Sequence, residues 1–213
     1  MKAASFSARR STITALMGRN GAGKSTMLRI AVGRVRPDYG RVLFDGAFVE
    51  RPSLAAMARK GLFYSAQDSV LTDLFTIRQH LDAVARVFGR ELDLDEGIER
   101  LDLGEVLDRK PNALSGGERR RASLAIAIVR KPTCLLMDEP FVGVAPKDRP
   151  LIADGLLALR DGGCAVVISG HDVEDLFAVA DEIVWVVAGT SHGIGSPEQA
   201  REHWQFRREY LGR

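Results

Sequence analysis

The sequence predicts an α/β fold with a mainly parallel sheet flanked by helices and with a helical subdomain inserted between two strands. Two observations lead to this prediction. Short β-rich runs alternate with helical patterns over much of the 213 residues. Between Gln67 and Lys131 the character changes, because helical periodicity dominates there and no strong strand pattern occurs. We therefore expect one domain over residues 1–213, with a core formed by 1–66 and 131–213 and a helical subdomain formed by 67–130.

The expected strands are short apolar runs. In chain order they are ITALM (13–17), GRVLFDG (40–46), GLFYSA (61–66), TCLLMDEP (133–140), CAVVISG (164–170) and EIVWVVAG (182–189). A glycine-rich turn and a helix from about Lys24 follow the first strand. Within the subdomain the expected helices are TIRQHLDAVARVF (76–88), LDEGIERLDL (94–103) and ERRRASLAIAIVR (118–130). The last stretch, 196–213, has an amphipathic helical pattern.

Net charge, hydropathy and cysteine content give no support for several classes of protein. The net charge of +2 gives no reason to expect nucleic acid or an anionic membrane surface as the main partner. The longest apolar stretch, from Ala122 to Met137, is interrupted by Arg130, Lys131 and Pro132, and no signal-peptide pattern is present. The two cysteines are far apart and are expected to be ordinary core residues. We expect a soluble cytoplasmic protein.

A phosphate-binding loop is the first motif that carries chemistry. The segment GRNGAGKST fits G-x-x-x-x-G-K-[ST] without a gap. Backbone N–H groups of such a loop turn toward phosphate oxygens, and the N-terminus of the following helix attracts the anion. Lys24 is expected to reach the β- and γ-phosphates, and Ser25 to ligate Mg²⁺. The predicted nucleotide-binding residues of the loop are Gly18, Arg19, Asn20, Gly21, Ala22, Gly23, Lys24, Ser25 and Thr26.

Two acids close the strand CLLM at the edge of the sheet where ligands bind in open α/β folds. Neighbouring residues on a strand point to opposite sides, so the two carboxylates can act differently. We expect Asp138 to hold Mg²⁺ through water, and Glu139 to orient or deprotonate the water that attacks the γ-phosphate. A solvated strand end is the alternative, but two adjacent carboxylates repel each other and a cation relieves that repulsion.

A second glycine pair opens the helix that starts near Ser115. Ser115 and Glu118 form a capping box, which explains those two residues without a ligand. The pair Gly116-Gly117 is not explained in this way, because each glycine costs about 1 kcal/mol relative to alanine in a helix. Bare backbone at a helix N-terminus suits close approach to an anion.

Together, GRNGAGKST, LSGGE and LLMDEP resemble the ATP-binding cassette family, the nucleotide-binding subunits of ABC transporters. Their order and spacing match, and the similarity covers nearly the whole chain. The resemblance implies a P-loop NTPase (RecA-like) fold, ATP and Mg²⁺ as ligands, and two cassettes that enclose two ATP molecules. Ser115, Gly116 and Gly117 are then expected to contact the γ-phosphate held by the other cassette.

Two more positions follow from the resemblance. Gln67 corresponds to the Q-loop glutamine, which approaches Mg²⁺ and the attacking water beside the groove for a membrane subunit. His171 corresponds to the switch histidine, which contacts the γ-phosphate and assists without being the main base. The predicted catalytic residues are therefore Glu139, His171, Lys24 and Gln67, and the predicted metal-binding residues are Ser25, Gln67 and Asp138.

The pattern departs from the family in three places. The family's opening strand and adenine-stacking aromatic lie upstream of the segment that begins at Ala3, and we expect this chain to lack them. Stacking contributes about 1–3 kcal/mol, so ATP binding would be weaker by roughly five- to two-hundred-fold and less selective for the base. Ala145 replaces the D-loop aspartate, which predicts slower or less coupled hydrolysis. Ala66 replaces the proline before Gln67, which leaves that hinge less restricted.

The expected function is an ATPase subunit that drives a transporter through transmembrane partner subunits, as a homodimer or with a related cassette. It would bind the inner face of the membrane only through those partners. The alternative is a regulatory cassette that binds ATP and hydrolyses it weakly. A cassette ATPase of DNA repair or translation is disfavoured, because the chain has one set of motifs and no long insert. A P-loop kinase of small molecules is disfavoured more strongly, because such an enzyme does not need the LSGGE motif. The sequence leaves open the transported substrate, its direction, and the choice between homodimer and heterodimer.

Overall fold

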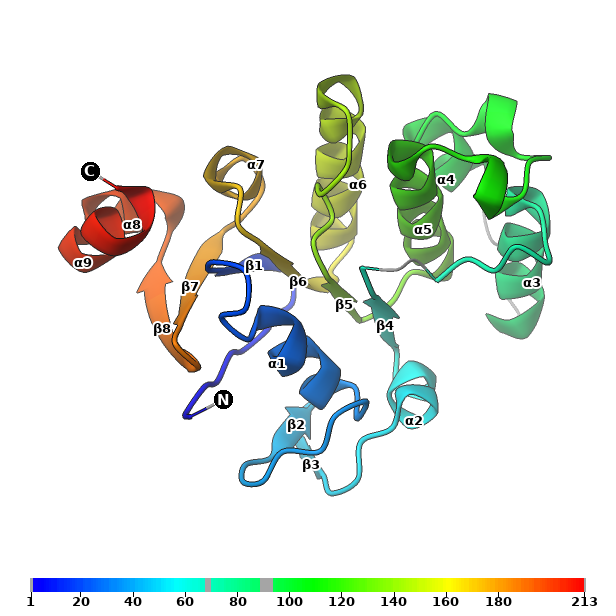
Figure 1. The fold of residues 1–213 in the computed structure, drawn as a ribbon. Coiled ribbons are helices and arrows are strands. Elements are labelled where there is room, and N and C mark those ends of the chain that lie inside the picture. The colour runs from blue at the N-terminus through cyan, green and yellow to red at the C-terminus, as the bar shows by residue number, and fades with distance from the viewer. Residues whose placement is uncertain (1, 68–69, 89–93, 213) are drawn as a thin grey trace.

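The structure is a computed structural model that describes residues 2–67, 70–88 and 94–212. Its centre is a six-stranded sheet in the order β4-β5-β6-β1-β7-β8 (Figure 1). The strands are β1 (Thr12–Met17), β4 (Leu62–Ser65), β5 (Cys134–Met137), β6 (Ala165–Gly170), β7 (Glu182–Val187) and β8 (Thr190–Gly195). The pairs among β4, β5, β6, β1 and β7 are all parallel, and β8 pairs antiparallel with β7. The carboxyl ends of five adjacent strands therefore meet at one edge, as the sequence predicts.

Both faces of the central strands are buried. In β1, Ile13, Ala15 and Met17 belong to one hydrophobic cluster, whereas Leu16 belongs to another that contains Leu28 of the following helix. This alternation is the two-residue period of a strand with helices on each side. Figure 1 shows α1 (Lys24–Ala31) and α2 (Leu54–Arg59) on one face and α6 (Arg149–Asp161) and α7 (Val173–Phe177) on the other.

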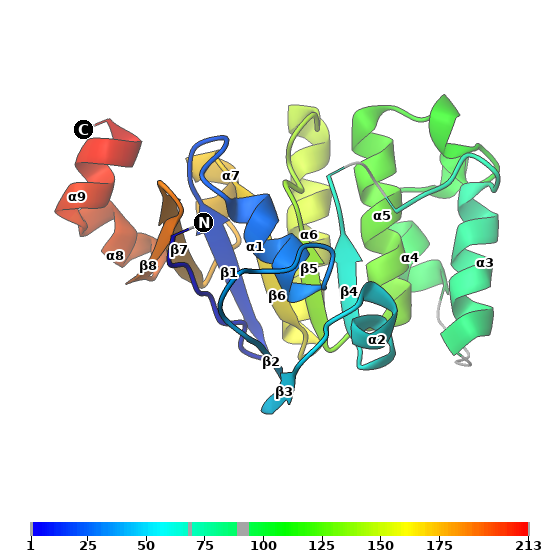
Figure 2. The same ribbon diagram turned by 60° about the horizontal axis from the view of Figure 1, so that its bottom comes forward.

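Three helices lie beside the sheet, beyond β4 (Figures 1 and 2). They are α3 (Ile77–Phe88), α4 (Leu94–Arg100) and α5 (Gly116–Arg130), and α5 packs against both α3 and α4. All three were expected to be helical from their periodicity. Residues 68–69 and 89–93 of the expected subdomain lie outside the described residues. The division of the chain into a core and a helical subdomain stays a prediction.

One expected strand has a different partner. The run 40–46 forms β2 (Val42–Phe44), which is not part of the main sheet but pairs antiparallel with β3 (Ala47–Val49). The turn between them is Asp45-Gly46, and both residues have positive φ, 52° and 76°. Such a two-residue turn directs the chain straight back on itself, so β2 pairs with the residues that follow it. The sequence analysis did not identify β3, β8, α2, α6 or α7.

The C-terminal stretch is helical, as expected, but it is divided into short pieces. They are α8 (Pro197–Glu202), α9 (Trp204–Phe206) and a π-helical turn (Arg207–Leu211). Cys134 and Cys164 are buried free thiols, so both are core residues as expected. Burial raises the pKa of each to about 12. Within the described residues, no helix has both the length and the apolar character needed to cross a bilayer.

Candidate active site

The phosphate loop connects the end of β1 to the start of α1. A Cβ atom on Gly18 would lie 2.2 Å from the carbonyl oxygen of Val186, so only glycine fits there. Gly21 and Gly23 have φ of 81° and 111°, which favours glycine at both positions. The loop is thus shaped by the chain itself, and the amide groups at the start of α1 lie at the carboxyl edge of the sheet.

Lys24 is folded back along this loop. Its side chain is buried, and Nζ donates hydrogen bonds to the carbonyl oxygens of Gly18 (2.7 Å) and Arg19 (3.2 Å). Burial lowers the pKa of Lys24, while the charges of Glu139 and Asp138 act in the opposite direction. A partly desolvated ammonium group is a strong electrostatic partner for a phosphate oxygen.

Asp138 is fully buried and joins three segments of the chain. Its Oδ1 atom accepts a hydrogen bond from Ser25 Oγ (3.0 Å) and another from Ser169 Oγ, while its backbone N–H donates to Ser65 O (2.9 Å). Its Oδ2 atom is buried without a hydrogen-bond partner among the described residues. Such a free carboxylate oxygen calls for a cation or a water.

The chemistry of these donors fits Mg²⁺. A serine hydroxyl and a carboxylate lie within 3.0 Å of each other, and oxygen atoms are the ligands that Mg²⁺ prefers. No cluster of three or more His, Cys, Asp or Glu suited to a metal occurs in the described part of the chain. Mg²⁺ at nucleotide sites ordinarily uses one or two protein ligands together with phosphates and water.

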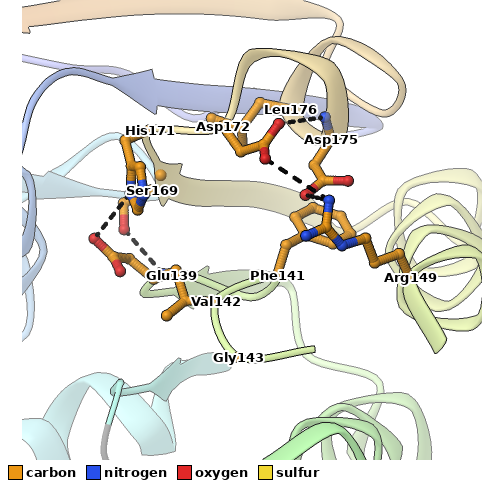
Figure 3. A pocket seen from close by; sticks show the side chains of 11 residues that line it. Glu139, Phe141, Val142, Gly143, Arg149, Ser169, His171, Asp172, Asp175 and Leu176 are labelled. Atoms are coloured by element: carbon orange, nitrogen blue, oxygen red, sulfur yellow. Dashed lines mark hydrogen bonds and ion pairs between the residues drawn. The ribbon is translucent and has the colours of Figure 1, made fainter. Parts of the chain in front are cut away.

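Glu139 has an unusual backbone. Its φ is 51°, in the left-handed region that non-glycine residues rarely adopt. The backbone N–H of Glu139 donates to Ser169 Oγ (3.1 Å), which holds this conformation (Figure 3). Its Oε1 atom lies 3.8 Å from Nδ1 of His171, as Figure 3 also shows. The predicted base and the predicted switch histidine therefore face each other from the ends of β5 and β6.

Two cavities adjoin at Glu139. One has a volume of about 300 Å³, and its described lining is Asn20, Gly21, Gly23, Lys24, Ser25, Thr26, Gln67 and Glu139. Gln67 thus lines the same cavity as the phosphate loop, whereas Gly18, Arg19 and Ala22 do not line it. The other cavity, of about 210 Å³, lies between the segment after β5 and the segment after β6 (Figure 3).

The second glycine pair lies elsewhere. Ser115, Gly116 and Gly117 are not among the residues that line either cavity. The capping box is confirmed: Ser115 N–H donates to Glu118 Oε2 (2.6 Å), and Glu118 N–H donates to Ser115 Oγ (3.2 Å). Ser115 and Gly116 are exposed at the start of α5, where another molecule could reach them.

Packing within the chain gives both glycines a structural reason that the capping box does not supply and that the sequence analysis did not foresee. A Cβ on Gly117 would lie 2.9 Å from Oδ2 of Asp148, and a Cβ on Gly116 would lie 3.0 Å from the carbonyl oxygen of Gly143. Both glycines therefore let the start of α5 approach the segment between β5 and α6. This contact is formed by residues 27 to 31 positions away, which the local pattern does not reveal.

Comparison with known proteins agrees with this geometry. A protein-family model described as "ABC transporter" matches residues 1–142. The chain belongs to the ABC transporter family. The match includes the phosphate loop, the signature residues Ser115 to Gly117 and the two acids at the end of β5.

Relatives of this cassette cover most of its length. It is 35% identical over 206 residues to "Lipopolysaccharide export system ATP-binding protein LptB" of Haemophilus influenzae, which covers 94% of this chain and 86% of the relative. It is 33% identical over 206 residues to the LptB of Escherichia coli, with the same two coverages. These relatives are ATP-binding subunits of ABC transporters.

Solved structures share the fold of the cassette. A nucleotide-free ATP-binding cassette from an ABC transporter superposes with a TM-score of 0.81 at 22% identity, over 95% of this chain and 87% of that one. The described structure is thus a P-loop NTPase fold, as predicted.

Sequence reasoning missed two residues at this site. Ser169 contacts both Asp138 and Glu139, and Tyr210 donates from its hydroxyl to the carbonyl oxygen of His171 (2.8 Å). Burial raises the pKa of Tyr210 to about 12, so its hydroxyl stays protonated. The only feature of the sequence that could have pointed to Ser169 is its position two residues before His171. Nothing in the C-terminal pattern points to Tyr210.

Proposed function

We propose that this cassette hydrolyses ATP with Mg²⁺ and that the reaction drives transport through transmembrane partner subunits. The observation that carries the proposal is the convergence of Lys24, Ser25, Asp138, Glu139 and His171 at the carboxyl ends of β1, β5 and β6. A buried cation, an oxygen-rich metal site and a carboxylate beside a histidine are the groups that phosphoryl transfer to water requires.

Each side chain has a distinct role in this proposal. Lys24 contacts the β- and γ-phosphates, and Ser25 and Asp138 hold Mg²⁺, which neutralises phosphate charge. Glu139 orients or deprotonates the attacking water, because it lines the same cavity as the phosphate-loop residues. His171 donates a hydrogen bond to the γ-phosphate, and Gln67 lies where it can contact the metal and the water.

A second cassette completes the site in this proposal. Ser115 and Gly116 are exposed, and the signature residues do not line the cavity of their own phosphate loop. Ser115 and Gly116 are therefore available to the γ-phosphate of another copy of this chain or of a related cassette, whereas Gly117 is buried. The anion would meet bare backbone at the N-terminus of α5, a helix of 15 residues.

The proposed location is the cytoplasmic face of a membrane, through partner subunits that contain the membrane-spanning segments. The names of the relatives support coupling to transport, since they include lipopolysaccharide export and, at 34% identity, Nod factor export in Rhizobium etli. A regulatory cassette with weak hydrolysis is the second candidate, and the observation that favours it is Ala145 in place of the D-loop aspartate.

The test is the steady-state ATPase rate of the chain with its membrane partner, compared with Glu139→Gln. Loss of the base should lower kcat by about 10²–10⁴-fold. The control is Glu198→Gln, an exposed acid of α8 that bonds Ser196, which should keep the parent rate. An unchanged rate in Glu139→Gln would remove Glu139 as the base, and a parent chain without turnover would favour the regulatory cassette.

A further inference from the structure

Arg149 is the first residue of α6, and it contacts two functional loops at once. Its Nη1 atom lies 2.9 Å from Oδ2 of Asp175 and 3.7 Å from Oδ2 of Asp172, both at the start of α7 (Figure 3). Its Nε atom lies 3.5 Å from the carbonyl oxygen of Val144, in the segment that follows Glu139. Arg149 therefore connects the segment after β5 to the segment after β6.

These segments are also connected close to the site, where Ser169 donates a hydrogen bond to Asp138 and His171 lies beside Glu139. The backbone N–H of Glu139 donates to Ser169 Oγ, on the far side of His171 from Asp172. His171 thus lies between two fixed points, Ser169 and the start of α7. Figure 3 shows the cavity of about 210 Å³ between them, with His171 and Glu139 at one end and Arg149 at the other.

Asp172 also caps the N-terminus of α7, so its position affects the start of that helix. Its Oδ1 atom accepts hydrogen bonds from the backbone N–H groups of Glu174 (3.1 Å) and Asp175 (3.3 Å), so it caps α7. Because Asp172 directly follows His171, a shift of this cap moves the histidine backbone. Arg149 lies against the same carboxylate from the side of α6.

Electrostatics make Arg149 hard to replace. Asp172 and Asp175 are like charges on one helical turn, and the Asp175 side chain is only 12% exposed. Among the described residues, Arg149 is the one cation within 4 Å of either carboxylate. Burial raises the pKa of Asp175, with a further upward contribution from Asp172 that Arg149 opposes. Removal of one partner from such a pair leaves a poorly solvated charge, and the start of α7 has to rearrange.

We propose that Arg149 is a positioning residue for hydrolysis, which ties the segment after Glu139 to the start of α7 and so holds His171 opposite Glu139. The proposal rests on the proposed ATPase function and adds a residue to it. In this proposal Arg149 forms a link within the chain, four residues after Ala145. Ala145 is the position at which the family's D-loop aspartate is absent from this cassette.

The first test is kinetic, in the full chain with its membrane partner. Arg149→Met should lower kcat about 10- to 100-fold, because a misplaced catalytic group costs rate, while KM for ATP stays within about twofold. Arg149→Lys keeps the charge and should lie between the parent and Arg149→Met. The matched control is Arg160→Met, at the other end of α6, where Arg160 pairs with Asp161 and Asp181.

A double-mutant cycle tests the pair itself. Asp175→Asn breaks the same contact from the other side and also serves if Arg149→Met does not fold. If the two residues act as one unit, the double variant should be no slower than the slower single variant. Multiplied rate losses would overturn the proposal.

A third readout does not need hydrolysis. Hydrogen exchange of the backbone amides of residues 170–177 should become at least about tenfold faster in Arg149→Met and stay unchanged in Arg160→Met. Unchanged exchange there overturns the proposal whatever the ATPase result. A kcat within twofold of an active parent, or a loss expressed mainly in KM, overturns the proposal and leaves the proposed function intact. A parent chain that does not hydrolyse ATP overturns the proposed function, and with it any role of Arg149 in hydrolysis.

Discussion

The hydroxyl of Ser25 donates a 3.0 Å hydrogen bond to Oδ1 of Asp138, although the two residues are 113 positions apart in the sequence. This contact joins the phosphate loop to the acidic end of β5 and makes them one site. Ser169 donates to the same carboxylate oxygen from β6, so three parallel strands contribute to it. The parallel order β5-β6-β1 is what brings these strand ends together.

Replacement of Ser169 by alanine tests whether this serine holds the two acids. Ser169→Ala removes a hydrogen bond to the buried carboxylate of Asp138 and the acceptor of the Glu139 amide. We expect the free energy of unfolding to fall by about 1–3 kcal/mol, measured by urea denaturation, and the ATPase rate to fall with it. Ser191→Ala is the control, since Ser191 also makes two hydrogen bonds, both to Ser5, far from the site. Equal losses in the two variants would contradict the role of Ser169.

Restoration of the family aspartate tests the effect of Ala145. Ala145 precedes the 3₁₀ turn Pro146–Asp148 with extended backbone and without a side-chain cap. Ala145→Asp should supply that cap and raise the free energy of unfolding by about 0.5–2 kcal/mol, and the ATPase rate should rise. Ala145→Ser is the control, because it supplies a cap without a carboxylate and should stabilise the chain without raising the rate. No gain in rate from Ala145→Asp would count against the proposed cost of Ala145.

The capping box of α5 predicts a pH dependence. The hydrogen bond from the Ser115 backbone is the main cause that lowers the pKa of Glu118 below 4.5. A carboxylate with a lowered folded-state pKa stabilises the fold above its unfolded-state pKa, and the stabilisation is lost as the pH falls through the folded-state pKa. Glu118→Gln should therefore unfold more easily than the parent at neutral pH, by a few tenths to about 1 kcal/mol. This difference should vanish once the pH falls below the folded-state pKa of Glu118, and a difference that persists in acid would show that ionisation of Glu118 is not its cause.

Gly117 tests the packing between α5 and the segment before α6. An alanine Cβ would lie 2.9 Å from Asp148, a buried residue whose carboxylate is 3.6 Å from Arg121. Gly117→Ala should lower the free energy of unfolding by about 1–3 kcal/mol because Asp148 must move, despite the better helix propensity of alanine. Gly104→Ala, where a Cβ meets nothing within 4 Å, is the control. A stabilised Gly117→Ala would show that packing against Asp148 does not require glycine at this position.

The sequence predicts the parts of this protein that local patterns encode. Apolar runs identify five strands of the main sheet, and the phosphate loop is recognisable because its glycines and Lys24 are contiguous. Strand β8 (Thr190–Gly195) contains two glycines and little apolar character, so it has no strand pattern of its own and depends on pairing with β7. Ser169 and Arg149 act through residues 23 to 31 positions away, and their contacts exist only after the fold has formed.

The central claim is that ATP is enclosed between two cassettes, with Ser115, Gly116 and Gly117 of one facing the phosphate loop of the other. The most direct measurement is the mass in solution of Glu139→Gln with Mg²⁺ and ATP, by analytical ultracentrifugation, alone and with its membrane partner or a related cassette. The account predicts a nucleotide-dependent dimer of cassettes, and its loss when Ser115→Arg is added to Glu139→Gln. Cassettes that bind ATP and stay monomeric in both settings would contradict it.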